Sequence, residues 1–215
     1  IKKKSFIFTP IINEIKKGLK SGGGWSEENI KEMIGVAKYM NTTYDIIETA
    51  NLFFEWAPGC TSIITQDSNG EILHGRNFDM PLNILSEILI ELEFKKNNKI
   101  IYKGNGFAGY IGLTTAMRPG KFSISANSRF QGGLFGKFNF LQKLNFFEKI
   151  KAAKMGGRPI GVFIRDIVEN KNSFKNALNI LKNEILINIG YYALAGINSN
   201  EGVIVTRNRF GVDNS

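Results

Sequence analysis

The side chains best suited to covalent chemistry lie between Gly59 and Asp79. Cys60 is the single cysteine of the chain, and Arg76 and Asp79 follow it 16 and 19 residues later. If the residues between them fold back as a hairpin, a thiol, a guanidinium and a carboxylate meet at one strand end and can form a nucleophile site. A lone cysteine is more often an inert core thiol, but this one directly follows a Pro-Gly pair and begins an expected strand.

The hairpin is indicated by two short strands on either side of a tight turn. The strands are expected over Cys60–Gln66 and Glu71–Asn77, and the turn over 67–70 has the sequence Asp-Ser-Asn-Gly. The Asn-Gly pair supplies the positive φ angles that such a turn requires. His74 and Arg76 share one face of the second strand, because successive side chains of a strand alternate. The spacing therefore also permits a Cys–His dyad.

The region before the cysteine is expected to form an N-terminal helical hairpin. Residues 1–24 are basic and are expected to be irregular, ending in a flexible Ser-Gly-Gly-Gly linker. Apolar residues with helical spacing predict one amphipathic helix over about 27–40. A second helix, capped by Thr43 or Asp45, is expected to run to about Phe54.

The region after the hairpin mixes strands and helices. Strands are expected at about 88–95, 100–103, 110–116, 122–127, 185–195 and 202–207, and helices at about 138–153, 159–169 and 173–182. Strands followed by helices and further strands are typical of a layered α+β domain.

Composition indicates a globular chain with a basic surface. A length of 215 residues and a hydrophobic content of 43% suffice for one well-buried core. The formal net charge of +9 has two interpretations, dispersed solubilising lysines or attraction to an anionic membrane surface. The basic residues form no stripe with stacking aromatics, so no nucleic-acid partner is expected.

Two further features bear on where the protein acts. Asn41-Thr42-Thr43 is an acceptor sequon for N-glycosylation at Asn41. No apolar run is long enough to cross a bilayer, and no secretory signal opens the chain, although one could have been removed before Ile1.

Several motifs carry a family resemblance. They are Cys-Thr-Ser-Ile at 60–63, His-Gly-Arg-Asn-Phe-Asp at 74–79, Phe-Ala-Gly-Tyr-Ile-Gly at 107–112, Pro-Gly-Lys-Phe-Ser at 119–123 and Gly-Val-Ile-Val-Thr-Arg-Asn-Arg at 202–209. Together they resemble the acid ceramidase and N-acylethanolamine-hydrolysing acid amidase family. These N-terminal-nucleophile cysteine amide hydrolases are related more distantly to the choloylglycine (bile salt) hydrolases and penicillin V acylases.

The resemblance implies an αββα sandwich of the N-terminal-nucleophile type. Residues 1–59 then correspond to a helical pro-segment, and residues 60–215 to the hydrolase core, which is expected to be incomplete at its C-terminal end. The implied substrate is a lipid amide, with no cofactor and no metal. The implied location is lysosomal or in the secretory pathway, and the cleaved 1–59 segment is expected to stay associated.

The resemblance also implies how the nucleophile is made. The Cys60 thiol attacks the Gly59 carbonyl, and water hydrolyses the resulting thioester. The freed α-amine of Cys60, with an ordinary pKa of about 7.7–8.0, then accepts the thiol proton. Asp79 is expected to orient this amine and Arg76 to steady local charge, while the backbone amide of Asn77 is an oxyanion contact.

Two departures from the family pattern concern the pocket. Asn127 and Arg129 match as pocket residues, but Ser128 stands where relatives carry a glutamate. Relatives also continue to a Thr-Asn-Tyr-Asp segment whose asparagine supplies an oxyanion-hole side chain, and this sequence does not contain it. Loss of one oxyanion donor typically costs ~10²–10³ in rate.

Three functions therefore stay open. The first is a cysteine amidase that hydrolyses fatty-acid amides, N-acylethanolamines before ceramide, through an acyl-thioester on Cys60. The second is a hydrolase or acyltransferase with a Cys60–His74 dyad, which needs no self-cleavage. The third is a degenerate relative that binds lipid without catalysis.

Overall fold

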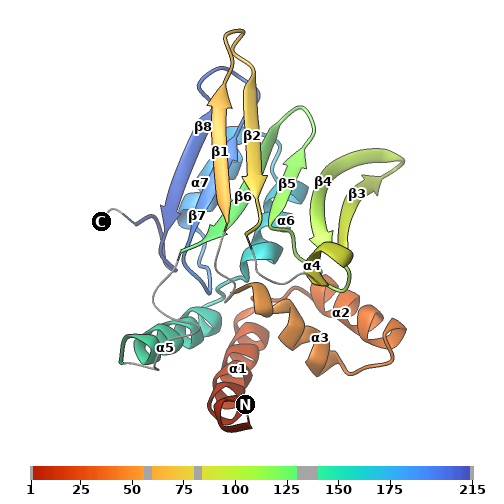
Figure 1. The fold of residues 1–215 in the computed structure, drawn as a ribbon, viewed down its shortest axis with the longest axis vertical. Coiled ribbons are helices and arrows are strands. Elements are labelled where there is room, and N and C mark those ends of the chain that lie inside the picture. Colours follow the sequence, from red (N-terminus) through yellow and green to blue (C-terminus); the bar gives the residue numbers. More distant parts are fainter. Residues whose placement is uncertain (1, 56–59, 80–83, 130–139, 214–215) are drawn as a thin grey trace.

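The computed structural model describes residues 2–55, 60–79, 84–129 and 140–213 (Figure 1). Its helices are α1 (Lys2–Gly22), α2 (Glu27–Tyr39), α3 (Tyr44–Asn51), the short 3₁₀ helix η1 (Phe53–Glu55), α4 (Ile84–Glu87), α5 (Phe140–Lys154), α6 (Ile160–Asn170) and α7 (Phe174–Asn183). Its strands are β1 (Thr61–Gln66), β2 (Ile72–Asn77), β3 (Leu89–Lys96), β4 (Lys99–Phe107), β5 (Thr115–Arg118), β6 (Phe122–Ser128), β7 (Gly190–Ala195) and β8 (Gly202–Arg207).

The strands form two antiparallel sheets that pack face to face. β1 and β2 pair only with each other, and the second sheet has the order β3-β4-β5-β6-β7-β8. The small sheet contacts β6, β7 and β8 on one face of the large sheet, while α6 and α7 contact the strands from the other side (Figure 1). The described residues thus form both sheets and one helical layer of an αββα sandwich, and the predicted α+β class is confirmed.

Alternation along β6 explains how the large sheet serves both neighbours. Ile124 and Ala126 belong to an apolar cluster that includes Phe163 and Ile164 of α6. The intervening Ser125 bonds to side chains of the small sheet instead. Because side chains of a strand alternate between the two faces, one face of β6 is apolar and the other polar.

The prediction that residues 1–24 are irregular was wrong, because Lys2–Gly22 form helix α1. The segment is helical because Ile15 and Leu19 are fully buried in a cluster that also contains Ala153 of α5. A Cβ at Gly18 would lie 2.9 Å from the Cβ of Ala153, so the glycine permits this close approach. Most helical stability in proteins comes from such packing. The basic composition of the segment gave no indication of it.

The predicted helical hairpin is confirmed, with one boundary changed. Thr43 caps α3 by accepting a hydrogen bond from the Ile46 amide. The helix ends at Asn51, not near Phe54, and η1 follows it. The buried Asn51 side chain bonds to backbone groups of Gly109 and Ile111, which ties the helical hairpin to the core.

Two predicted strands begin later than expected. The strand predicted for 110–116 is seen only from Thr115, because Leu113 donates to the carbonyl of Gly161 in α6. Gly112 and Gly161 also lie in close contact, which a Cβ on either would prevent. The strand predicted from 185 begins at Gly190.

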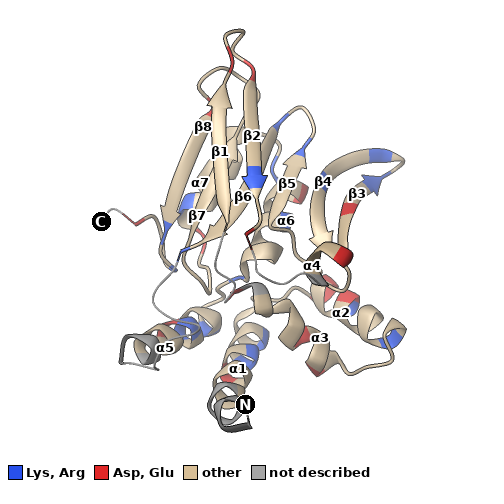
Figure 2. Cartoon of the chain, in the orientation of Figure 1, with Lys and Arg blue, Asp and Glu red and all other residues tan. Residues whose placement is uncertain are grey.

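Charge is spread over many elements. Lys and Arg appear on helices, at strand ends and on the β3–β4 tip, interspersed with Asp and Glu (Figure 2). Within the described residues, none of the helices is long and apolar enough to span a membrane.

The packing of α1 can be tested with a pair of neighbouring substitutions. Leu19→Ala should lower the free energy of unfolding by about 2–5 kcal/mol, because it leaves a cavity in a fully buried site. The adjacent Lys20 is exposed, so Lys20→Ala should change stability by no more than about 0.5 kcal/mol. Chemical denaturation of both variants measures the difference, and equal small effects would contradict a packed α1.

Candidate active site

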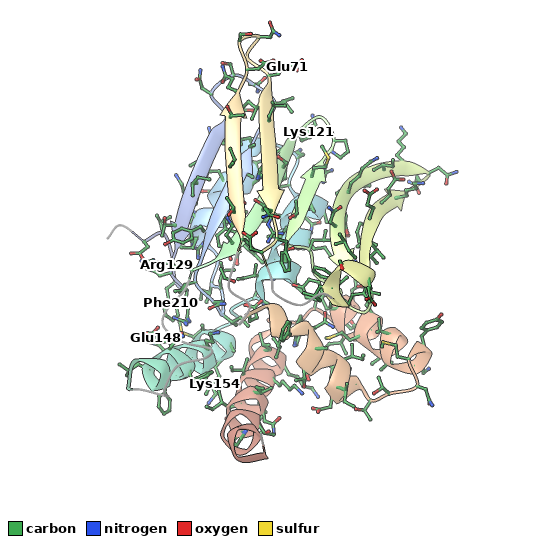
Figure 3. All side chains as sticks on the ribbon, viewed as in Figure 1. Glu71, Lys121, Arg129, Glu148, Lys154 and Phe210 are labelled. Atoms are coloured by element: carbon green, nitrogen blue, oxygen red, sulfur yellow. The ribbon has the colours of Figure 1, made fainter. Side chains whose placement is uncertain are left out.

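The hairpin predicted around the cysteine is present in the structure. In its turn, the Asp67 carboxylate accepts hydrogen bonds from the amides of Asn69 and Glu71, and Gly70 adopts a φ of 85°. The register pairs Ser62 with Arg76. Glu71 lies at the far tip of the hairpin (Figure 3), so the opposite end returns the second strand to the cysteine.

Arg76 reaches the sulfur of Cys60. Its Nη2 donates to Sγ at 3.0 Å and to the carbonyl of Ala126 at 2.9 Å. Its Nη1 donates to the hydroxyls of Thr115 at 3.0 Å and Thr114 at 3.3 Å. Backbone and hydroxyl groups at β5 and β6 therefore hold the guanidinium against the thiol. The sequence predicted that Arg76 lies near Cys60, but it did not predict these supporting groups.

Asp79 joins the same strand end. Its carboxylate accepts hydrogen bonds from the Thr61 hydroxyl at 3.2 Å and from the side-chain amide of Asn77. The backbone of Asp79 is also hydrogen-bonded to Cys60. The thiol, guanidinium and carboxylate grouped from the sequence thus lie at one strand end, and the Asn77 side chain donates to the carboxylate.

The surroundings keep the thiol protonated. Burial raises the pKa of Cys60 above its ordinary value, and the Arg76 guanidinium and the Asp79 backbone oppose this only in part. Since the thiolate is the nucleophilic form, the cysteine needs a base to react at neutral or acidic pH.

His74 is not placed as that base. Its Nδ1 and Nε2 bond to the hydroxyls of Ser123 and Ser125, at 2.8 and 2.9 Å. Burial, and then the nearby Arg76 charge, lower the pKa of the imidazole. Both ring nitrogens are therefore engaged between the sheets, and the histidine is held neutral over a wider pH range.

Asn127 lies next to the nucleophile strand. The Ser62 hydroxyl lies 3.0 Å from the Asn127 side-chain amide and 2.8 Å from the Ser125 hydroxyl. These contacts connect Asn127 to the strand that begins one residue after Cys60.

Arg129 has other partners. It forms an ion pair with Asp213 and lies over the Tyr191 ring, 5.9 Å from the centroid. Figure 3 places it at the base of the large sheet, above Glu148 of α5. Its assignment as a pocket residue stays a prediction.

Two adjoining cavities surround the site. A cavity of about 20 Å³ is lined by Cys60, Arg76, Thr114, Ser128 and Ile160 among others, which is room for about one water molecule. A larger groove of about 820 Å³ shares Arg76 and Thr114 with it and runs between β2 and strands β3 to β5. Ser128 is thus one of the residues that line the cysteine cavity.

Sequence reasoning missed the groups that support Arg76. Thr114 and Thr115 follow a glycine-rich passage, and this hydroxyl pair was the available signal.

Gly59 lies outside the described residues. Asn41 is exposed with a φ of 50°. Among the residues that the structure describes, no group of three or more His, Cys, Asp or Glu side chains is arranged to hold a metal.

Comparisons with known proteins agree on one family. The sequence profile described as "Linear amide C-N hydrolases, choloylglycine hydrolase family" matches residues 60–210. The chain is 37% identical to an N-acylethanolamine-hydrolyzing acid amidase of Caenorhabditis elegans over 210 residues, which is 96% of this chain and 54% of that protein. It is 34% identical to the acid ceramidase of Bos taurus over 195 residues, which is 83% of this chain and 47% of the relative.

A solved structure supports the same assignment. The Caenorhabditis elegans N-acylethanolamine-hydrolyzing acid amidase (NAAA) ortholog superimposes with a TM-score of 0.61 at 34% identity. The match covers 72% of this chain and 62% of that one. The chain spans about half the length of the curated relatives it matches.

The Arg76–thiol contact predicts how the uncleaved chain reacts with an alkylating agent. Because burial raises the pKa of Cys60, its alkylation by iodoacetamide should still rise with pH where the rate for an ordinary thiol has already levelled off. Arg76→Ala removes the cation that lowers this pKa, so alkylation at any one pH should slow further, by about tenfold per pKa unit.

Arg118→Ala is the matched control, because this half-buried arginine donates to the carbonyls of Val168 and Glu169 and not to the thiol. Intact-mass measurement over short times separates alkylated from unalkylated chain. Equal alkylation rates in the two arginine variants would show that Arg76 does not act on the sulfur.

Proposed function

Because the chain belongs to the choloylglycine hydrolase family of linear amide C–N hydrolases, we propose that it is a cysteine amidase acting on lipid amides. The observation that carries this proposal is the 3.0 Å contact between Arg76 and the sulfur of Cys60 at the start of β1. It supports a nucleophile that becomes active once Cys60 is an N-terminal residue.

The first step of the proposal is self-cleavage. The Cys60 sulfur attacks the carbonyl carbon of Gly59, and the peptide nitrogen leaves as the α-amine of Cys60 after taking the thiol proton. Water then hydrolyses the thioester, which yields a free carboxylate on Gly59 and regenerates the thiol. The cavity beside the sulfur has room for one water molecule.

The second step is hydrolysis of the substrate. The α-amine of Cys60 accepts the thiol proton, and the sulfur attacks the amide carbonyl of the lipid. The C–N bond breaks as the leaving amine takes the proton, and a fatty acyl-thioester remains on the sulfur. Water attacks this thioester and releases the fatty acid, so that no oxidant or cofactor takes part.

The neighbouring groups supply charge and orientation in this scheme. The Asp79 carboxylate, fixed by Thr61 and Asn77, orients the new α-amine. Arg76 stabilises the thiolate as it forms, and the backbone amide of Asn77 serves as an oxyanion donor. Asn127 is assigned to the substrate pocket through its contact with Ser62.

We place the lipid in the groove beside Arg76. A volume of about 820 Å³ lies in the range of about 300–1,000 Å³ that is usual for small-molecule sites. Much of its lining is apolar and suits an acyl chain, with Leu73, Phe78, Leu89, Leu92, Phe107 and Met117. N-acylethanolamines are the preferred candidates over ceramide, in keeping with the similarity to the amidase of Caenorhabditis elegans.

The remaining parts of the proposal concern the whole protein. We propose that residues 1–59 stay attached after cleavage, since α1 packs on α5 of the core. We also propose glycosylation at the exposed Asn41, a lysosomal or secretory location, and, from the net charge of +9, attraction to anionic membranes.

Removal of the nucleophile tests both steps at once. Cys60→Ala should abolish the appearance of a Cys60 amino terminus and the release of fatty acid from N-acylethanolamines. Intact-mass analysis after incubation at acidic pH follows the first, and chromatography of the lipid products follows the second. Retained turnover in this variant would refute the proposal, and lipid binding by the wild type without product release would favour a non-catalytic relative, as Ser128 suggests.

A second substitution separates the amidase from a Cys–His hydrolase. His74→Ala breaks two hydrogen bonds between the sheets, so it should lower the free energy of unfolding by about 1–3 kcal/mol. At a temperature where the variant is folded, cleavage between Gly59 and Cys60 should still occur. An intact bond in fully active wild-type protein, with activity lost in His74→Ala, would support the dyad instead.

A further inference from the structure

Glu55 ties the end of the N-terminal segment to three parts of the core. It belongs to η1, five residues before Cys60, and is only 1% exposed. Its Oε1 accepts a hydrogen bond of 2.7 Å from the amide of Ile160, the first residue of α6. Its backbone carbonyl accepts hydrogen bonds from the Lys149 ammonium of α5, at 3.1 Å, and from the Asn188 side-chain amide before β7.

The charged surroundings of Glu55 are buried as well. Lys149 and Arg209 are each 2% exposed, and both exert an electrostatic influence on the carboxyl group. The hydroxyls of Tyr110 and Tyr192 are also close enough to interact with it electrostatically. The second oxygen, Oε2, is buried and makes no hydrogen bond among the described residues. We refer to Glu55, Lys149, Ile160, Asn188 and Arg209 as the Glu55 hub.

The Glu55 hub lies next to the candidate active site. Ile160, which donates to Glu55, also lines the cavity that contains Cys60 and Arg76. Four residues separate Glu55 from Cys60, and five fully extended steps span at most about 18 Å. Because Cys60 is itself fixed at the start of the hairpin, this short connection to Glu55 limits the orientations open to the peptide bond before Cys60.

We propose that Glu55 is a positioning residue for self-cleavage, which helps to orient the carbonyl before Cys60 toward the sulfur and keeps residues 1–59 attached afterwards. The positioning role rests on the proposed function, because it requires self-cleavage. The anchoring of residues 1–59 by Glu55 does not depend on it. Placement matters because a displacement of about 1 Å at a reacting group can cost about 10²-fold in rate.

The hub also gives cleavage a pH dependence. Burial raises the pKa of Glu55 to about 7, with Lys149 and the Ile160 amide opposing the shift. Between the ordinary carboxyl range and about pH 7, the folded chain therefore binds a proton at Glu55 that the unfolded chain lacks. Burial also lowers the pKa of Lys149 to about 7, so below this pH the lysine carries its proton in both states and only the Glu55 proton favours the folded chain. That proton stabilises the folded hub progressively as the pH falls from about 7, and we expect cleavage to become faster over the same interval.

Three variants separate positioning from general stability. Glu55→Ala should slow cleavage by about 10²-fold, whereas Glu55→Gln, which still accepts from Ile160, should cleave near the wild-type rate without the pH dependence around 7. The matched control is Glu48→Ala. Glu48 is also buried, with a pKa raised by burial, but its partners Lys16 and Tyr44 lie in the same N-terminal segment. That variant should lose stability and keep its cleavage rate.

Cleavage is followed by intact mass from pH 4.5 to 8, and anchoring is measured separately in a Cys60→Ala background, which cannot cleave. There Glu55→Ala should reduce hydrogen-exchange protection of the Ile160 amide at least tenfold, while Glu48→Ala should not. Unchanged protection, or cleavage equally slow in both alanine variants, overturns the inference. A wild-type chain that never cleaves overturns the proposed function and the positioning role, while the exchange result still decides whether Glu55 anchors the segment.

Discussion

The hydrogen bond between the Arg76 guanidinium and the Cys60 sulfur is the contact on which the site depends. It places a permanent cation against a thiol whose pKa is raised by burial, and it opposes that shift in part. A guanidinium can do this because its planar array of donors also reaches the Ala126 carbonyl and two threonine hydroxyls. The compact ammonium of a lysine could not satisfy all of these acceptors. The arginine therefore fixes the small sheet, the large sheet and the nucleophile relative to one another.

The interface between the sheets is polar near this contact. Ser62 and His74 of the small sheet bond to Ser123, Ser125 and Asn127 on one face of β6. A one-residue slip of either strand would turn these side chains to the opposite face and leave buried donors unpaired, which costs about 1–3 kcal/mol each. The hydrogen bonds thus specify register where apolar packing would tolerate alternatives, and the apolar face of β6 against α6 supplies the burial.

The N-terminal segment is part of the folded domain. Three kinds of contact join it to the core: the packing of α1 on α5, the Asn51 side chain on the backbone of the glycine-rich passage, and the Glu55 hub at the start of α6. Each lies between residues far apart in sequence. A segment held in this way can stay in place when a single peptide bond after it is broken.

The sequence by itself determined the local features of this protein. The Asn-Gly turn, the alternation of β1 and β2, the cap of α3, and the grouping of Cys60 with Arg76 and Asp79 all depend on short-range spacing. Tertiary structure decided the rest: that residues 2–22 are helical, that His74 bonds to serines and not to the thiol, and that Thr114 and Thr115 support the arginine. The contacts in the site depend on partners 38 to 51 residues away. The helical state of residues 2–22 depends on packing against α5. Periodicity and propensity report a residue's own backbone, whereas a hydrogen bond between sheets or a buried helix face exists only once the partner has been brought to it.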